Sequence, residues 1–227
     1  AGQFLRSINV TYDAEYPERI AHFRPTSKSA TLIRALCGMG SDRAFFVVAP
    51  YGSGKSLAAT YQLQLIENQS ESKAVLKQIA NRLSDVSPDL GKFATSRIRS
   101  KKRGLALVLQ GYCRPLPKQL RDAALSAMKR ARLGREARPI SALPVASMDD
   151  AVEILLQVAA KCKNRGVDHI TILWDEFGRH IESLIDEGRT SELEDLQTLA
   201  EFVARFSDLP LTLGLFMHQG LLHYAGR

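Results

Sequence analysis

Apolar residues in this chain are grouped in two kinds of segment that alternate along the sequence. Short apolar runs rich in β-branched and aromatic residues predict strands at residues 43–48, 105–110, 168–174 and 211–217. Longer segments with apolar residues at helical spacing predict helices at residues 26–36, 55–67, 71–86, 117–133, 151–163, 179–187 and 191–206. Helix-length segments between strands favour parallel pairing. The expected fold class is therefore α/β with three layers, in which helices cover both faces of a mainly parallel central sheet.

Local signals refine this outline. The runs at residues 43–48 and 105–110 are apolar at nearly every position, which is typical of strands buried on both faces. Thr26 is placed to cap the first helix, and Ser147, followed by two aspartates, to cap a later one. Ser87-Pro88 is expected to close a helix, and a proline-containing loop is expected before Ser147.

The composition suits a folded chain with its own core. Of 227 residues, 45% are hydrophobic and 24% are charged, which excludes a disordered chain, a collagen-like repeat and a disulfide scaffold. No apolar run approaches the roughly 20 residues that span a bilayer, so we expect no membrane partner. Three cysteines lie far apart without a CxxC pair, which favours a reducing compartment, and we expect a cytoplasmic protein.

Positive charge is concentrated in two stretches. The chain has 31 lysines and arginines against 24 acids, a net charge of +7, and basic residues gather at 96–104 (SRIRSKKRG) and 129–138 (KRARLGREAR). The stretches could follow the backbone of a polyanionic partner such as a nucleic acid, but a solvated basic face is the favoured interpretation. They lack the interleaved aromatic residues of a stacking platform. The histidines have no spacing typical of zinc ligands, so we expect no structural zinc.

A glycine-rich loop, APYGSGKS at residues 49–56, joins the first predicted strand to a helix. Gly52 and Gly54 allow backbone N–H groups to surround phosphate oxygens, and the start of the helix adds its positive dipole end. Lys55 can reach the β- and γ-phosphates, and the Ser56 hydroxyl can ligate Mg²⁺. The residues expected to contact the nucleotide are Pro50, Tyr51, Gly52, Ser53, Gly54, Lys55, Ser56 and Leu57.

This loop departs from the P-loop pattern GxxxxGK[ST] at one position, where Ala49 replaces the first glycine. Alanine has a small side chain and fits if its backbone φ is negative. A turn that merely joins a strand to a helix is the alternative interpretation. The flanking strand and helix favour the phosphate-binding one.

The third predicted strand ends in two adjacent carboxylates, in the segment ITILWDE at residues 170–176. In a P-loop NTPase, a carboxylate at this position holds Mg²⁺ and a second can activate the attacking water. Asp175 fits the first role and Glu176 the second. Two acids also end a strand by chance, but the distance along the chain from the glycine-rich loop favours the catalytic interpretation. No guanine-reading motif is present, so ATP is favoured over GTP.

Polar and basic residues near the strand ends are candidate sensors and arginine fingers. His218 and Gln219 follow the fourth strand, where a polar residue can touch the γ-phosphate, and a capping or solvent-exposed pair is the alternative. Arg179 and Arg205 are candidates for reaching the nucleotide of this chain or of a neighbouring subunit. For both, a surface arginine paired with acids such as Glu201 is the favoured interpretation.

Three segments carry a resemblance to a known group of proteins. The loop PYGSGKS, the segment LWDEFGRHIE and the closing HQGLLHYA resemble the large P-loop ATPases of prokaryotic antiphage defence systems such as BREX. More broadly, they resemble the AAA+/STAND group of ASCE ATPases. The resemblance implies Mg²⁺-dependent ATP hydrolysis in a homo-oligomer or larger complex, with Lys55, Ser56, Asp175 and Glu176 at matching positions. It also implies an adenine pocket near residues 23–26.

The resemblance sets the expected domain organisation and function. Residues 1–227 are expected to form one ATPase core, with an N-terminal extension and helix at 1–40 and the nucleotide-binding core at 41–227. Such ATPases continue with a fifth strand and a helical lid, so we expect a core truncated after the fourth strand and lacking that lid. The favoured function is an ATPase module that drives conformational change. The alternatives are a nucleotide-dependent switch or oligomerisation platform with little hydrolysis, and a nucleic-acid motor with residues 97–103 on the substrate.

Overall fold

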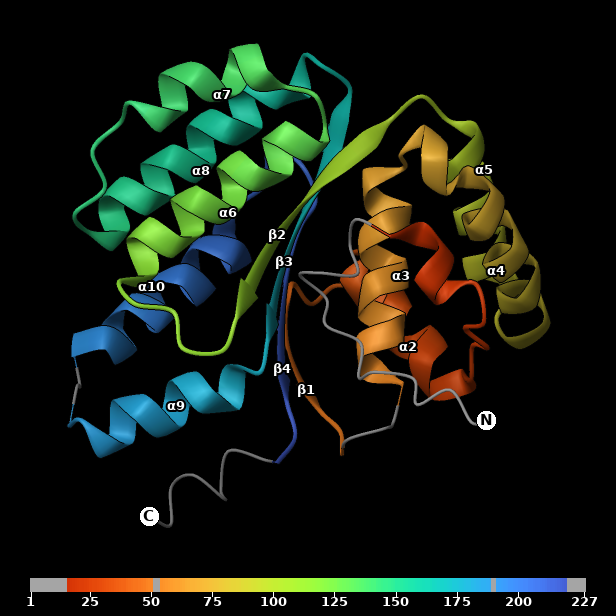
Figure 1. Ribbon diagram of the computed structural model, residues 1–227, viewed down its shortest axis with the longest axis horizontal. Coiled ribbons are helices and arrows are strands. Elements are labelled where there is room, and N and C mark those ends of the chain that lie inside the picture. The colour runs from red at the N-terminus through yellow and green to blue at the C-terminus, as the bar shows by residue number, and fades with distance from the viewer. Residues whose placement is uncertain (1–15, 51–53, 189–190, 220–227) are drawn as a thin grey trace, which may run out of the picture.

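A parallel sheet organises the computed structural model, which describes residues 16–50, 54–188 and 191–219. Within these residues the sheet has four strands in the order β1-β4-β3-β2, and every neighbouring pair is parallel (Figure 1). The strands are β1 (Ala44–Val48), β2 (Arg103–Gln110), β3 (Val167–Asp175) and β4 (Leu211–Met217). The α/β class and the parallel pairing predicted from the sequence are confirmed.

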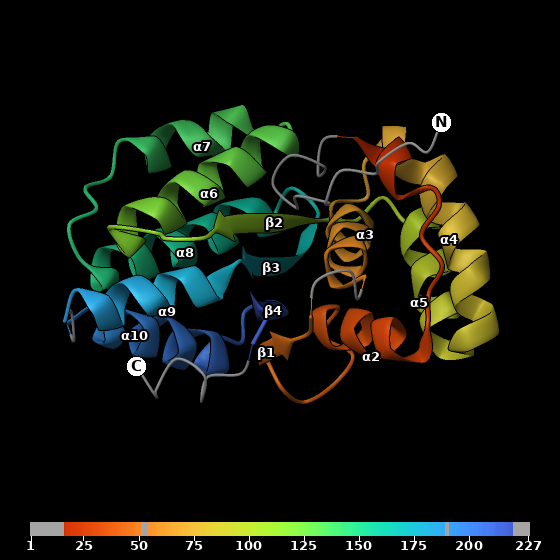
Figure 2. The ribbon, with the colours of Figure 1, turned by 60° about the horizontal axis from the view of Figure 1, so that its bottom comes forward.

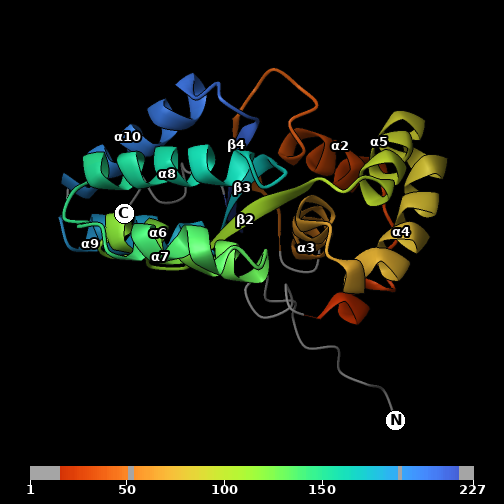
Figure 3. The same cartoon turned by 90° about the horizontal axis from the view of Figure 1, so that it is seen from above.

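Helices cover both faces of this sheet. Figures 1 and 3 show α2–α5 on one side and α6–α10 on the other, and Figure 2 shows that α4 and α5 lie outside α3. The helices are α2 (Ser27–Leu36), α3 (Lys55–Glu67), α4 (Lys73–Val86), α5 (Pro88–Arg99), α6 (Leu116–Arg130), α7 (Gly134–Ser141), α8 (Met148–Lys163), α9 (Phe177–Asp186) and α10 (Ser191–Arg205), with short 3-10 helices η1 (Pro17–Ile20) and η2 (Ser70–Ser72).

Two helices begin at the predicted caps. The Thr26 hydroxyl accepts a hydrogen bond from the Ser29 N–H, and the Ser29 hydroxyl accepts one from the Thr26 N–H. Ser147 and Asp150 form the same reciprocal capping box at the start of α8. Each box satisfies backbone donors that the first helical turn leaves without a partner.

Two helices, α5 and α7, were not predicted from the sequence. α5 fills the segment after Ser87, because Pro88, taken as a helix stop, is the first residue of a new helix. Gly91 lets α5 approach α4 closely, since a Cβ there would lie 2.1 Å from the Ser84 Oγ. α7 occupies part of the expected proline-containing loop and buries Ile140. The predicted end of a helix at Ser87-Pro88 is confirmed, since α4 ends at Val86, whereas the loop expected before Ser147 was wrong where α7 lies.

β1 differs from its predicted environment. Phe46 is 56% exposed and Val48 is 50% exposed, while Phe45 and Val47 pack toward α2 and α3. β1 lies at the edge of the described sheet, and the helices that cover β3 and β4 leave one face of β1 open. The prediction that this strand is buried on both faces was wrong, because an apolar run does not reveal a strand's place in the sheet.

The carboxyl-terminal end of α3 is held by side chains from other elements. Arg97 is buried and donates hydrogen bonds to the carbonyls of Leu65 and Ile66 and to the Asp168 carboxylate. These contacts satisfy carbonyls that the last helical turn leaves unpaired. Arg97 therefore belongs to the core, and its predicted place on a nucleic-acid surface was wrong. No helix among the described residues is long and apolar enough to cross a membrane.

Candidate functional site

The carboxyl ends of β1, β4 and β3 form one edge of the sheet, where α3 and α9 begin (Figure 1). β4 lies between the other two strands, which places β1 and β3 about 10 Å apart at the usual spacing of about 4.8 Å. The Ala49 N–H donates to the Met217 carbonyl at 3.1 Å, and the Gly111 N–H donates to the Asp175 carbonyl at 2.8 Å. The strand ends are thus fixed relative to one another.

Lys55 stands at the first turn of α3, directed back toward the end of β1. Gly54 precedes it with φ of 79°, a left-handed conformation that glycine adopts without a steric penalty. The Lys55 ammonium donates to the Ala49 carbonyl at 3.0 Å, and the residue is only 7% exposed. Burial lowers the pKa of Lys55 below its usual value, and the nearby Asp175 carboxylate opposes that shift.

The structure describes only part of the glycine-rich loop that precedes α3. Tyr51, Gly52 and Ser53 lie outside the described residues. In the described part of the chain the non-glycine residues with positive φ are Asn68, Arg132 and Glu176, so Ala49 has the negative φ that its alanine requires. Pro50 lies two residues after the end of β1, and Ser56 and Leu57 are half-buried on the first turn of α3, beside its positive dipole end.

His218 contacts Lys55 from the tip of β4. The His218 Nδ1 lies 2.9 Å from the Lys55 Nζ. Burial and the Lys55 ammonium lower the pKa of His218, with the Glu176 carboxylate and the Ala49 backbone opposing. Because an ammonium group only donates, the neutral imidazole accepts at Nδ1 and carries its proton on Nε2. The structure therefore brings this sensor candidate to Lys55, while Gln219 is exposed.

Asp175 and Glu176 occupy the end of β3 and the residue before α9. Asp175 is only 7% exposed, and its carboxylate accepts a hydrogen bond from the Glu176 N–H at 2.9 Å. Glu176 has φ of 52°, which is rare for a residue with a Cβ and costs about 1–3 kcal/mol. Such strain is typical of functional positions. Glu176 also forms an ion pair with Arg179 at 3.3 Å.

No family model, curated protein or solved structure matches this chain. The chemistry of the site rests on the residues that the fold brings together. These are an ammonium group, a neutral imidazole and two carboxylates at one edge of the sheet.

The donor set fits a small divalent cation shared with phosphate oxygens. Asp175 and Ser56 would supply a carboxylate and a hydroxyl oxygen, and Mg²⁺ is usually held by one or two such oxygens together with phosphates and waters. No group of three or more His, Cys, Asp or Glu side chains suited to a metal occurs among the described residues. A cation bound mainly by protein side chains is therefore not supported at this edge.

A cluster of aromatic rings, which the sequence did not indicate, packs around the first turn of α9, next to Glu176. His180 packs against Trp174 and Phe177 with ring centroids 4.7 and 6.2 Å apart, and its Nδ1 accepts the Cys113 N–H. Burial lowers the pKa of His180 to about 4, so this histidine is neutral. The Trp174 Nε1 donates to the Gly111 carbonyl at 2.9 Å. The cluster holds the first turn of α9, and with it Glu176, against the end of β2.

Two other predicted residues are placed elsewhere. Arg205 ends α10 next to the amino end of β4, pairs with Glu201 at 3.8 Å, and lies at the opposite edge of the sheet from Lys55. A role in the nucleotide site of its own chain is therefore excluded by the topology. Phe23 is buried and packs against Tyr61 of α3, so it is part of the core rather than the wall of an adenine pocket.

Proposed function

We propose that this chain is a Mg²⁺-dependent ATPase module of the P-loop type. One observation carries the proposal: the Lys55 ammonium, at the start of α3, is hydrogen-bonded to His218 on the strand between β1 and β3 and lies near the Asp175 carboxylate. A phosphate-binding lysine and an acidic strand end are thus close enough to act on one polyphosphate. The sequence motifs support the same function.

Each residue has a distinct task in this proposal. Lys55 and the N–H groups at the start of α3 bind the β- and γ-phosphates. Ser56 and Asp175 hold Mg²⁺, which offsets charge on those phosphates when bound. Glu176 orients the attacking water and accepts its proton at the carboxylate. His218, neutral and bonded to Lys55, is placed to respond to the γ-phosphate.

The resemblance to antiphage ATPases extends the proposal. On that basis, hydrolysis drives conformational change in a homo-oligomer or a larger complex that contributes to prokaryotic defence. All three cysteines are buried free thiols, which suits the reducing cytoplasm. Arg179, which is 66% exposed beside Glu176, is the better candidate than Arg205 for contact with a neighbouring subunit's nucleotide.

Two substitutions test this function. Glu176→Gln should retain ATP binding and reduce turnover by about 10²–10⁴-fold, because the amide cannot accept the proton. Lys55→Ala should lose ATP binding. Glu194→Gln and Lys28→Ala change the same residue types on exposed helix positions and serve as controls. Unchanged phosphate release in Glu176→Gln, or unchanged ATP binding in Lys55→Ala, would contradict the assignment.

A nucleotide-dependent switch with little hydrolysis is the second candidate. The ion pair between Glu176 and Arg179 favours it, since the guanidinium occupies the carboxylate that would otherwise orient the attacking water. Arg179→Ala should then raise the single-turnover rate, whereas a module built for rapid turnover should gain nothing. Tight nucleotide-driven oligomerisation with slow turnover in the unmodified chain would favour the switch.

A further inference from the structure

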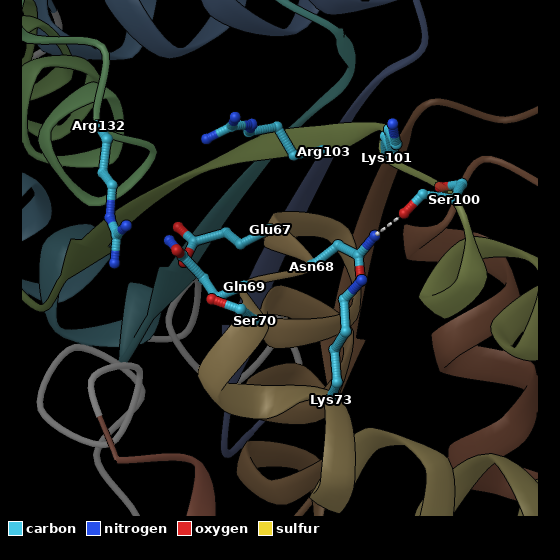
Figure 4. Close-up of a pocket in the computed structure, with 9 residues that line it drawn as sticks. All are labelled: Glu67, Asn68, Gln69, Ser70, Lys73, Ser100, Lys101, Arg103 and Arg132. Carbon is cyan, nitrogen blue, oxygen red and sulfur yellow. Dashed lines mark hydrogen bonds between the residues drawn. The ribbon is translucent and has the colours of Figure 1, made fainter.

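The two basic stretches of the sequence meet at the amino end of the sheet, the edge opposite Lys55. A pocket of about 280 Å³ lies between the end of α3 and the start of β2. Figure 4 shows four cations around it: Lys101 from the connection between α5 and β2, Arg103 from the start of β2, Lys73 from α4 and Arg132 from the connection after α6.

A second cavity continues the first. It has a volume of about 600 Å³ and shares Arg103 and Arg132 with the first pocket, so the two form one groove. Arg135 and Arg165 line this second part. We call this surface the basic groove and define it by Lys73, Lys101, Arg103, Arg132, Arg135 and Arg165.

Acidic residues do not neutralise the basic groove. Its two lining carboxylates, Glu67 and Glu136, are held by Arg130 and Arg165. A third carboxylate, Glu71, pairs with the groove residue Arg132 at 2.9 Å, so six cations against three carboxylates leave a net charge of +3. The ammonium groups of Lys73 and Lys101 make no hydrogen bond or ion pair with any residue in the described ranges, so they are available to a ligand.

Hydrogen bonds hold the walls of the basic groove in place. Asn68, the residue after α3, donates from its side-chain amide to the carbonyls of Ser100 and Lys102 at 3.3 and 3.0 Å. Arg103 donates to the Ala131 carbonyl at 2.7 Å. A ligand would therefore meet a formed surface and would not have to order these segments, which favours affinity.

The lining indicates which class of polyanion fits. It contains no aromatic residue, and Leu133 is its one large apolar side chain. A protein interface would have an apolar or aromatic core, and a reader of single-stranded bases would offer stacking surfaces. A surface of cations that has neither an apolar core nor stacking rings suits the repeated negative charge of a phosphodiester backbone. We propose that the basic groove binds the phosphodiester backbone of a nucleic acid without reading its sequence.

Binding of labelled mixed-sequence DNA and RNA, measured by fluorescence anisotropy without nucleotide, tests this proposal. The 227-residue chain should bind at about 50 mM salt and lose affinity steeply by about 200 mM. The double substitution Lys73→Glu with Lys101→Glu should weaken binding by at least about tenfold and reduce the slope of log K against log salt by about two. Lys28→Glu with Lys92→Glu makes the same charge change on exposed lysines outside the groove and should have a smaller effect.

Several results would overturn the proposal. These are absence of binding at low salt, equal losses in the two double variants, strong preference for one sequence, or equally tight binding of poly-glutamate. The last would indicate an acidic protein partner. If the glutamate variant is not folded by circular dichroism, Lys73→Gln with Lys101→Gln replaces it, with an expected smaller loss in the same direction. Because no nucleotide is present, failure here leaves the proposed ATPase activity untouched.

Discussion

Replacing Arg97 by methionine tests whether this residue belongs to the core or to a ligand surface. Methionine keeps most of the apolar stem and removes the guanidinium. The substitution deletes hydrogen bonds to Leu65 at 3.1 Å and to Ile66 at 2.6 Å, and the ion pair with Asp168 at 2.9 Å. It leaves two helix-end carbonyls and one carboxylate without these partners.

The size of the effect follows from the burial of each partner. Breaking a fully buried ion pair costs about 3–5 kcal/mol. The Asp168 side chain is 31% exposed and keeps some hydration, which places its contribution near the lower end, but the two carbonyls add a further loss. We expect the free energy of unfolding of Arg97→Met to fall by about 3 kcal/mol. For a chain of this length that lowers the melting temperature by about 6–12 °C.

Urea unfolding followed by circular dichroism measures this difference. Lys28→Met is the control, because Lys28 is exposed and should change the free energy of unfolding by less than about 0.5 kcal/mol. Folded Arg97→Met should bind nucleic acid with the same salt slope as the unmodified chain. A loss of stability below about 1 kcal/mol together with weaker nucleic-acid binding would refute the reasoning and return Arg97 to the ligand surface.

Three further measurements address other residues. Glu176→Gly should be more stable than Glu176→Ala by about 1 kcal/mol in urea unfolding, since glycine tolerates the φ of 52°; equal stabilities would argue against strain. His180 has a pKa of about 4 against about 6.5 when unfolded, so the unfolded chain binds more protons between these values. Stability should therefore fall by up to about 3 kcal/mol from pH 6.5 to 4, and His180→Leu should remove that part of the slope. Gly91→Ala should destabilise by about 1–3 kcal/mol through contact with Ser84, whereas Gly134→Ala, with open space around it, should not.

Most elements of the fold could be predicted because their patterns are local. The helix at Lys55–Glu67 and the strand at Leu211–Met217 were predicted with the bounds that the structure has. α5 was missed because Pro88 is compatible with both the end of one helix and the first turn of the next. The structure has both, and the close packing of Gly91 of α5 on α4 is a contact that no local pattern shows.

The candidate site was predictable in its residues but not in its geometry. The loop and acidic motifs indicated Lys55 and Asp175, yet their proximity depends on β4 lying between β1 and β3. The contact between His218 and Lys55 joins residues 163 positions apart. No local pattern predicts a contact between residues so far apart in the sequence, because strand order is set by how helices pack on the two faces of the sheet.

The basic groove was harder still to predict, because charge along a sequence does not report burial. Arg97 lies within a basic stretch and is buried, while Lys101, four residues later, is exposed. Lys73 and Arg165 lie outside both stretches and still line the groove. Tertiary packing therefore both removed a predicted cation from the surface and added cations that the stretches did not contain.

α3 separates the candidate nucleotide site from the basic groove, which makes the two proposals independently testable. Lys55 begins this helix and Glu67 ends it, and 13 residues at about 1.5 Å each place the two sites about 20 Å apart. That distance exceeds the Debye length of about 8 Å at physiological salt, so a charge change at one site has little direct effect at the other. Lys55→Ala should thus lose ATP binding and keep nucleic-acid binding, and Lys73→Glu with Lys101→Glu should do the reverse. If either variant, still folded, lost both ligands, the sites would not be separate, and one shared anion-binding surface would explain the data better.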